Sequence, residues 1–211
     1  MTRPILWSFR RCPYAMRARL AIASAGISVD LREILLRDKP AAFLATSHSG
    51  TVPCLDTGKE VIDESLDIML WALRHADPEG LLAMPEAGFD LIATSDGPFK
   101  AALDRYKYAV RFDDVDIGAE QEKAALFLRK LEDRLVGQSW LFGARPSLAD
   151  LAILPFVRQF AHVDLPWFEA QEWTGVAGWL DRFKTSERFA SIMRKYPAWK
   201  PGDKPVAFPE G

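Results

Sequence analysis

The chain has 211 residues, 49% of them hydrophobic, which is enough for two domains of ordinary size with a sizeable core. Its 27 basic and 29 acidic residues give a formal net charge of −2, which excludes the basic composition typical of nucleic-acid-binding proteins. Only two cysteines are present, which is too few for the disulfide framework of a small secreted protein.

The sequence pattern predicts neither a membrane-spanning helix nor a signal peptide. No stretch approaches the roughly 20 apolar residues that a membrane-spanning helix needs. The apolar run at residues 5–9 is too short for a signal-peptide core. We therefore expect a soluble cytoplasmic protein that binds neither membranes nor nucleic acid.

The first 76 residues predict a mixed α/β domain. An apolar run such as residues 5–9 is typical of a buried strand, and Pro13 favours a helix that starts there. Gly26 is a natural stop for this helix. In chain order we expect a strand at 5–9, a helix from 13, a strand at 29–34, a short helix at 39–45, a hairpin at 52–62 and a helix at 64–75.

The rest of the chain predicts a helical domain. Residues 77–88 concentrate proline and glycine and indicate a linker. The last residues contain four prolines, so we expect a tail that extends over the surface. The predicted domains are therefore residues 1–76 and 88–211. The expected helices of the second domain are 89–111, with a break near 97–98, then 119–136, 147–161, and one or two more within 171–195.

Cys12 stands at the predicted start of the first helix, between Arg11 and Pro13. The unpaired N–H groups and the positive dipole end of a helix start favour a thiolate over a thiol. Because the thiolate is the nucleophile, this position indicates a reactive cysteine. The alternative is a small buried residue at a strand–helix junction, since free cysteine is among the most buried residue types.

Ala15 occupies the place, three residues after Cys12, where a dithiol oxidoreductase has its second cysteine. A mixed disulfide on Cys12 must therefore be released by an outside thiol. The other cysteine, Cys54, follows Pro53 on a predicted strand. We interpret Cys54 as a core residue on the face opposite Pro53.

Two further segments suit a peptide thiol as ligand. A cis Val52–Pro53 bond would turn the Val52 backbone outward, where it could pair with an extended peptide. At the next helix start, Ser65 and its neighbouring N–H groups can bind a carboxylate, and Glu64 can accept hydrogen bonds from an ammonium group. The alternative for Glu64 and Ser65 is ordinary helix capping.

Three motifs occur in one order along the chain: Cys12-Pro13-Tyr14-Ala15, Val52-Pro53 and Glu64-Ser65. Together they resemble the glutathione transferase superfamily, and more narrowly its cysteine-type members, the omega-like and related bacterial proteins. Ser147 and Asp150 resemble the reciprocal capping box of the family's core helix in the second domain. The resemblance implies an α/β thioredoxin-like N-terminal domain, an all-α C-terminal domain and a homodimer.

The resemblance also implies glutathione as co-substrate and a role for each matching residue. Cys12 would be the catalytic cysteine, and Val52 would pair with the backbone of the glutathione cysteinyl residue. Glu64 and Ser65 would hold the γ-glutamyl end, while Lys39 would face the glycyl carboxylate. The other expected glutathione-binding residues are Phe9, Tyr14 and Pro53.

A second substrate, a small electrophile or disulfide, would lie between Cys12 and the helical domain. The candidates to line that pocket are Tyr106, Tyr108, Arg111 and Trp167. Each of them has the alternative of being an ordinary core or surface residue. The three histidines lack metal-ligand spacing with the cysteines, so no metal site is predicted.

Three functions stay open at the level of sequence. The first is a thiol transferase in which Cys12 forms a mixed disulfide that glutathione resolves. The second is a conjugating transferase, in which Ser8 or Tyr14 would donate a hydrogen bond to the glutathione sulfur. The third is a non-catalytic binding module that reuses the fold. We favour the first, because a cysteine that faces the glutathione sulfur tends to form a disulfide with it.

Overall fold

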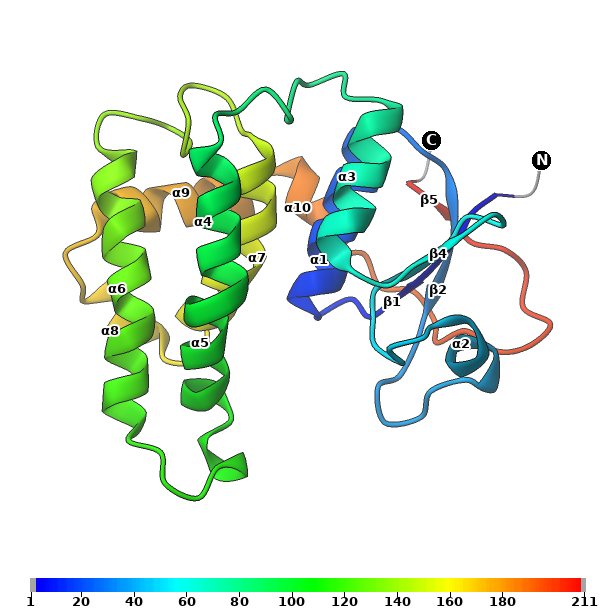
Figure 1. Cartoon of the computed structure of the whole chain (residues 1–211), viewed down its shortest axis with the longest axis horizontal. Helices are drawn as coiled ribbons and strands as arrows, with labels where there is room; N and C mark the ends of the chain where they lie inside the picture. Colours follow the sequence, from blue (N-terminus) through cyan, green and yellow to red (C-terminus); the bar gives the residue numbers. More distant parts are fainter. Residues whose placement is uncertain (1–2, 210–211) are drawn as a thin grey trace. The chain divides into compact units, whose positions relative to one another are not determined.

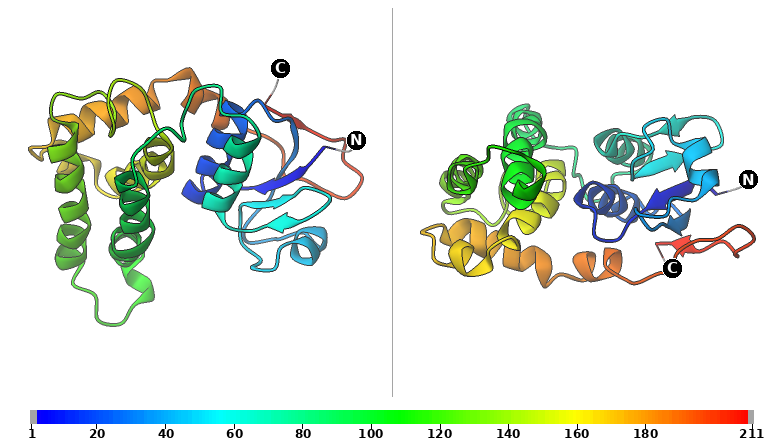
Figure 2. Two further views of the ribbon diagram at one scale, coloured as in Figure 1. Left: turned by 45° about the horizontal axis from the view of Figure 1, so that its top comes forward. Right: turned by 90° about the horizontal axis from the view of Figure 1, so that it is seen from below.

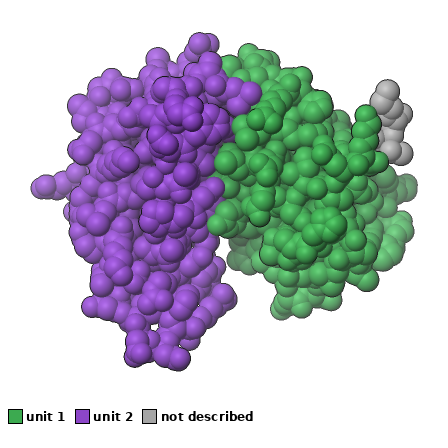
Figure 3. Space-filling view, in the orientation of Figure 1, with its two compact units in different colours: residues 1–80, 186–211 green, residues 81–185 purple. Residues whose placement is uncertain are grey.

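The computed structural model describes residues 3–209; residues 1–2 and 210–211, which the predicted domains include, lie outside the described part. The chain forms two compact units (Figure 3). Unit 1 comprises residues 1–80 and 186–211, and unit 2 comprises residues 81–185. The predicted domain 88–211 is therefore wrong at its end, because the described residues 186–209 belong to unit 1 and not to the helical unit.

Unit 1 is built on a five-stranded mixed sheet with the order β4-β3-β1-β2-β5 (Figure 1). The central strand β1 pairs in parallel with β2 and antiparallel with β3, so that Leu6 faces Leu31 on one side and Leu55 on the other. All three leucines are buried, as expected of apolar strands at the centre of a sheet. The strands are β1 (Ile5–Ser8), β2 (Val29–Glu33), β3 (Cys54–Asp56), β4 (Val61–Ile62) and β5 (Ala207–Phe208).

In the described part of unit 1, four helices accompany the sheet. Helices α1 and α3 pack against each other on one side of the sheet, and α2 lies on the other side (Figures 1 and 2). Gly26, with φ of 65°, ends α1 in the left-handed conformation that glycine adopts without a steric penalty. The helices are α1 (Pro13–Ser24), α2 (Ala41–Thr46), α3 (Ser65–His75) and α10 (Glu187–Ile192).

The proline-rich tail is part of the core of unit 1. Its last strand, β5, pairs antiparallel with β2, and Phe208 is buried. Upstream of β5, the Trp199 N–H donates to the Glu33 carbonyl at 2.8 Å, and its ring meets Trp7 edge-on. The tail is extended as expected, but its aromatic side chains bury apolar area against the sheet. This burial explains why the tail belongs to unit 1.

Unit 2 is helical. The helix expected at 89–111 is interrupted near residues 97–98, as predicted: α4 (Ala87–Thr94) is followed by a π-helical turn (Ser95–Phe99), by α5 (Lys100–Lys107) and by a 3-10 turn (Ala109–Arg111). The π turn contains Pro98, which has no N–H to donate to the helical ladder. The remaining helices are α6 (Ile117–Leu135), α7 (Leu148–Ala161), α8 (Leu165–Glu169) and α9 (Thr174–Lys184).

Helix α7 is the core helix of unit 2, and its start has the predicted capping box. The Asp150 carboxylate accepts hydrogen bonds from the Ser147 N–H at 2.8 Å and from the Ser147 hydroxyl at 2.7 Å. It also accepts from Leu141 N and from the Trp179 indole N–H, both at 2.9 Å. One buried carboxylate therefore joins α7, α9 and the loop before α7. No helix within residues 3–209 is both long and apolar enough to cross a membrane.

Candidate functional site

A cavity of about 500 Å³ lies in unit 1, where α1 and α3 begin. It brings together Cys12 and six of the seven residues predicted to bind glutathione. Phe9 is not among the lining residues, whereas Leu36, Thr51 and Asp63 line the cavity without having been predicted. The lining residues are Cys12, Tyr14, Leu36, Lys39, Thr51, Val52, Pro53, Asp63, Glu64 and Ser65.

Cys12 is the N-cap residue of α1, with the extended backbone (φ −73°, ψ 122°) that such a position requires. Its carbonyl accepts the first helical hydrogen bond, from Met16 N at 2.9 Å, while its side chain makes no capping bond. The sulfur lies at the start of the helix, beside N–H groups that have no partner within the helix. Cys12 is partly exposed and is not in a disulfide.

Cys54, by contrast, is fully buried, as the sequence predicted. Burial, together with the neighbouring Asp63 carboxylate, raises the pKa of the Cys54 thiol to about 12. At neutral pH this thiol is therefore protonated and a poor nucleophile. Of the two thiols, Cys12 is the one suited to nucleophilic chemistry.

The Val52–Pro53 peptide bond is cis, the form for which the Val52 backbone was expected to face outward. The Cys12 thiol points at the Val52 carbonyl, with a Sγ–O distance of 3.7 Å. Val52 and Pro53 both line the cavity, immediately before β3. The segment therefore presents main-chain atoms to the same space that the thiol faces.

The start of α3 forms another wall of the cavity. Ser65 is the first helical residue, and the first helical hydrogen bond runs from Ile68 N to the Glu64 carbonyl. The earlier N–H groups have no partner in the helix, which makes this end suitable for an anion. Glu64 is exposed and its side chain makes no capping bond, so the geometry does not support the ordinary-capping alternative for this residue.

Arg17, which was not predicted, contacts the start of α3 through Ser65. Its guanidinium is buried, lies over the Tyr14 ring at 5.3 Å and donates from Nε to the Ser65 hydroxyl at 2.9 Å. The position of Arg17 on an arginine-containing helix was visible in the sequence. Its contact with a residue 48 positions away was not.

Asp63 was also missed by sequence reasoning. Its carboxylate accepts hydrogen bonds from the Ser47 hydroxyl at 2.7 Å, from His48 N at 2.8 Å and from Ser49 N at 3.2 Å. Burial opposes ionisation, but these hydrogen bonds outweigh it and lower the pKa of Asp63. Lys39 holds the same loop from its other end, because its Nζ donates to the Gly50 carbonyl at 2.8 Å.

The four residues predicted for a second substrate all lie in unit 2. Tyr106 is buried, and its ring lies tilted against Phe160 at 5.7 Å between centroids, while Trp167 meets Phe160 edge-on at 5.9 Å. Tyr108 pairs with Arg111, whose guanidinium lies 4.2 Å from the Tyr108 ring. Tyr106 and Trp167 therefore share a contact with Phe160, and Tyr108 contacts Arg111.

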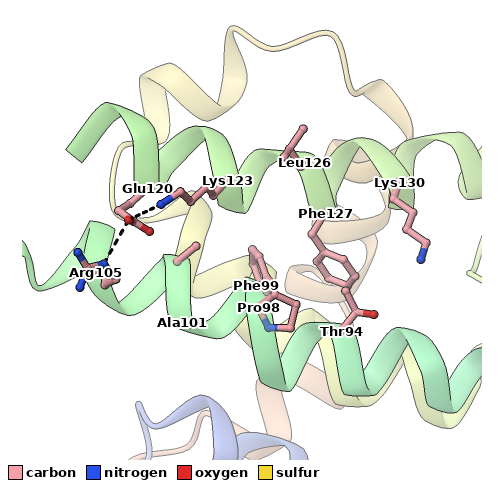
Figure 4. Close-up of a pocket in the computed structure, with 11 residues that line it drawn as sticks. Thr94, Pro98, Phe99, Ala101, Arg105, Glu120, Lys123, Leu126, Phe127 and Lys130 are labelled. Atoms are coloured by element: carbon pink, nitrogen blue, oxygen red, sulfur yellow. Dashed lines mark hydrogen bonds and ion pairs between the residues drawn. The ribbon is translucent and has the colours of Figure 1, made fainter. Parts of the chain in front are cut away.

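A larger cavity, of about 680 Å³, lies within unit 2 between α5 and α6 (Figure 4). Its walls are mostly apolar, with Phe99 and Phe127 at the centre. At one end Glu120 accepts hydrogen bonds from Arg105 and Lys123 (Figure 4). None of the predicted site residues lines this cavity. Over residues 3–209 there is no group of three His, Cys, Asp or Glu side chains placed to hold a metal ion.

Comparisons with known proteins agree with the fold. A probable glutathione transferase of Aplysia californica is 42% identical over 78 residues, covering 37% of this chain and 84% of the relative. Glutathione S-transferase omega-1 of Sus scrofa is 24% identical over 197 residues, covering 92% of this chain and 77% of the relative.

Solved structures show the same fold. A glutathione transferase family member from Pseudomonas fluorescens Pf-5, with two glutathione molecules bound, has a TM-score of 0.77 at 17% identity, over 90% of this chain and 92% of that chain. Glutathione transferase Omega 3C from Trametes versicolor has a TM-score of 0.76 at 18% identity, over 92% of this chain and 85% of that chain.

The family models match both parts of the chain. The glutathione S-transferase N-terminal domain matches residues 6–80, and the C-terminal domain matches residues 100–182. The expected architecture, a thioredoxin-like domain with a helical domain, is thereby confirmed. The chain belongs to the glutathione S-transferase family.

Proposed function

We propose that this glutathione transferase is a thiol transferase whose single catalytic cysteine, Cys12, forms and resolves a mixed disulfide with glutathione. The observation that supports the proposal is the N-cap position of Cys12 in a cavity that also contains Val52 and the start of α3. With Ala15 three residues further on, the motif has no internal resolving thiol.

The cavity offers complementary groups for each part of glutathione, and its volume is typical of a small-molecule site. The N–H groups at the start of α3 would hold the γ-glutamyl carboxylate, and Glu64 its ammonium group. Val52 would pair with the cysteinyl backbone, and Lys39 would attract the glycyl carboxylate. Each pairing joins a charged or polar group of the ligand to one of opposite character in the cavity.

The proposed reaction consists of two thiol–disulfide exchanges. The Cys12 thiolate attacks the glutathione sulfur of a glutathionylated substrate, forms a Cys12–glutathione disulfide and releases the substrate as a thiolate, which takes up a proton. The thiolate of a second glutathione then attacks the glutathione sulfur of that disulfide. Oxidised glutathione leaves, and the Cys12 thiolate is restored.

Electrophile conjugation is the less supported alternative. It calls for a hydroxyl donor to the glutathione sulfur, and Ser8 was one of two candidates. Ser8 is fully buried, does not line the cavity, and its hydroxyl accepts a hydrogen bond from Arg19 at 3.0 Å. Tyr14 is the candidate that lines the cavity.

We also propose a cytoplasmic homodimer that acts on a small electrophilic or disulfide substrate. The presence of both cysteines as free thiols is consistent with a reducing compartment. The cavity between α5 and α6, whose lining includes the 60% exposed Leu126, offers a surface for self-association. Sedimentation equilibrium of the purified chain would measure the mass of the assembly. A monomer at all concentrations would contradict the dimer.

Steady-state turnover of a small glutathione mixed disulfide with reduced glutathione tests the proposed reaction. We expect Cys12→Ser to lower kcat by at least about a hundredfold, because the nucleophile is removed. The matched control, Cys54→Ala, removes the buried thiol and should retain the activity of the folded protein. Equal activity of Cys12→Ser and wild type would overturn the proposal.

A further inference from the structure

Arg19 is fully buried in α1, and its guanidinium holds the loop that leads from β1 to Cys12. Its Nη2 donates to the Arg10 carbonyl at 2.7 Å, and its Nη1 donates to the Ser8 hydroxyl at 3.0 Å. Both acceptors lie within four residues of Cys12. The guanidinium is therefore a fixed support for the segment that places the thiol.

Glu33, at the end of β2, holds the same loop from its other side. Its Oε1 accepts a hydrogen bond from the Arg10 N–H at 2.6 Å, and its Oε2 lies 3.8 Å from Arg19 Nη1. The two members of one buried ion pair thus hold the N–H and the carbonyl of a single residue, Arg10. That residue stands two positions before Cys12.

A contribution to folding stability does not by itself explain the buried Arg19–Glu33 ion pair. Taking two charges out of water is costly, and well-packed apolar residues often stabilise a core as well as a buried ion pair does. Here two buried atoms, Arg19 Nε and Glu33 Oε2, make no hydrogen bond within the described part of the chain. A pair placed only for stability would be expected to satisfy these atoms.

Charged groups reach Cys12 both from α1 and from the cavity, and Arg11 is its neighbour in the chain. Arg19 interacts electrostatically with Glu33, Cys12, Tyr196 and Arg10. On the cavity side, the titratable groups that line the same space as Cys12 are Tyr14, Lys39, Asp63 and Glu64. Burial lowers the pKa of Arg19 to about 10, which leaves it protonated at neutral pH. Burial also raises the pKa of Glu33, whose ionised form Arg19 and the Arg10 N–H favour.

We propose that Arg19 and Glu33 are positioning residues for Cys12: together they fix the backbone before the thiol, and their opposite charges set how strongly the site favours the thiolate. The inference rests on the proposed role of Cys12 as the nucleophile. It extends that role to a pair of residues that do not line the cavity.

The two charges make opposite predictions for the pKa of the Cys12 thiol. Arg19→Met removes the cation and leaves Glu33, so the thiolate is disfavoured. Glu33→Gln keeps a hydrogen-bond acceptor for the Arg10 N–H but leaves the Arg19 cation without its counter-charge, so the thiolate is favoured. If Arg19 and Glu33 only kept the loop in place, both substitutions would be expected to shift the pKa of the Cys12 thiol in the same direction.

The test is the pH dependence of Cys12 alkylation by iodoacetamide in the full chain, with Cys54→Ala in every variant so that one thiol reacts. Relative to that background, we expect Arg19→Met to raise the apparent pKa of Cys12 by about one unit, which is about tenfold in thiolate population below the pKa. Glu33→Gln should lower the apparent pKa, Arg19→Lys should stay near the background, and the double variant should lie between the two single variants.

Shifts of the same sign in Arg19→Met and Glu33→Gln, or no shift in either, would overturn the inference. If Arg19→Met does not fold, Glu33→Gln decides alone: a lowered pKa supports the inference, and an unchanged or raised pKa overturns it. Alkylation needs no glutathione, so the result is independent of the proposed reaction. A protein with the expected shifts but no disulfide turnover would contradict the proposed function and leave this inference standing.

Discussion

The Arg17 guanidinium and the Ser65 hydroxyl join the starts of two helices, through a hydrogen bond of 2.9 Å from Arg17 Nε. Helix α1 has Cys12 at its N-cap, and α3 has Ser65 as its first residue. The contact therefore connects the thiol end of the cavity with the end that would bind a carboxylate. Because both side chains are buried, the bond is protected from competing water.

Ser65→Ala should weaken glutathione binding. The change removes a hydroxyl at the proposed γ-glutamyl site and deprives Arg17 Nε of this acceptor. Hydrogen bonds to charged groups contribute about 1.5–3 kcal/mol, so we expect the glutathione Kd to rise about tenfold or more. Titration calorimetry measures this, with Ser65→Thr as the control that keeps a hydroxyl. An unchanged Kd for Ser65→Ala would remove Ser65 from the binding site.

Asp63→Asn should change the acid stability of the protein. The pKa of Asp63 is lowered in the fold, so its contribution is present above the ordinary value of 3.8 and is lost as the pH falls through the folded-state pKa. At pH 7 we expect the variant to be less stable by about 1 kcal/mol, because an amide cannot accept all the hydrogen bonds of the carboxylate. Below about pH 3.8 the difference should narrow.

Urea unfolding between pH 3 and pH 7 measures this difference, and Asp38→Asn, on an exposed side chain, is the matched control. A constant difference between wild type and Asp63→Asn over that range would mean that the Asp63 hydrogen bonds do not distinguish the ionised from the protonated carboxyl group.

Asp150→Ala should be severely destabilising. The carboxylate is fully buried and accepts four hydrogen bonds, from Leu141, from both donors of Ser147, and from Trp179. Each buried donor left without a partner costs about 1–3 kcal/mol, so we expect a loss of more than about 3 kcal/mol. Denaturant unfolding tests this, with exposed Asp181→Ala as control. A loss comparable with that of the control would show that the network contributes little.

Phe208→Ala tests whether the tail is part of the core of unit 1. Phe208 is 1% exposed on β5, which is the edge strand next to β2. Truncation of a buried phenylalanine costs about 3–5 kcal/mol, so the free energy of unfolding should fall by about 3 kcal/mol. Lys204→Ala, on an exposed side chain of the same tail, should change it by less than about 0.5 kcal/mol. Equal effects of the two variants would contradict the packing of β5.

The features that sequence reasoning predicted are those with a local signal. Pro13 places the helix start after Cys12, Gly26 ends that helix, and Ser147 with Asp150 forms a capping box over four residues. In each case the physical cause is backbone geometry or a hydrogen bond between close neighbours in the chain. The three site motifs were connected only through the family resemblance, because no local rule relates one motif to the next.

The features that were missed depend on contacts between distant segments. Strand β5 has only two residues, which pair with Val29 and Asp30 near the other end of the chain, so no alternation of polar and apolar residues marks it. Arg17 and Asp63 gain their roles from loops and helices that only the fold brings near. Helix α8, Leu165–Glu169, has five residues and is too short for a periodic pattern.

The most direct measurement of the central claim is mass spectrometry of the intact chain after incubation with oxidised glutathione. The Cys12 thiolate should attack one sulfur of the disulfide and release one glutathione thiolate, which leaves a single glutathione adduct on Cys12 and none on the Cys12→Ser variant. Fragment analysis assigns the modified residue. An adduct only on Cys54, or no adduct on the folded wild-type protein, would contradict the assignment of Cys12 as the reactive thiol.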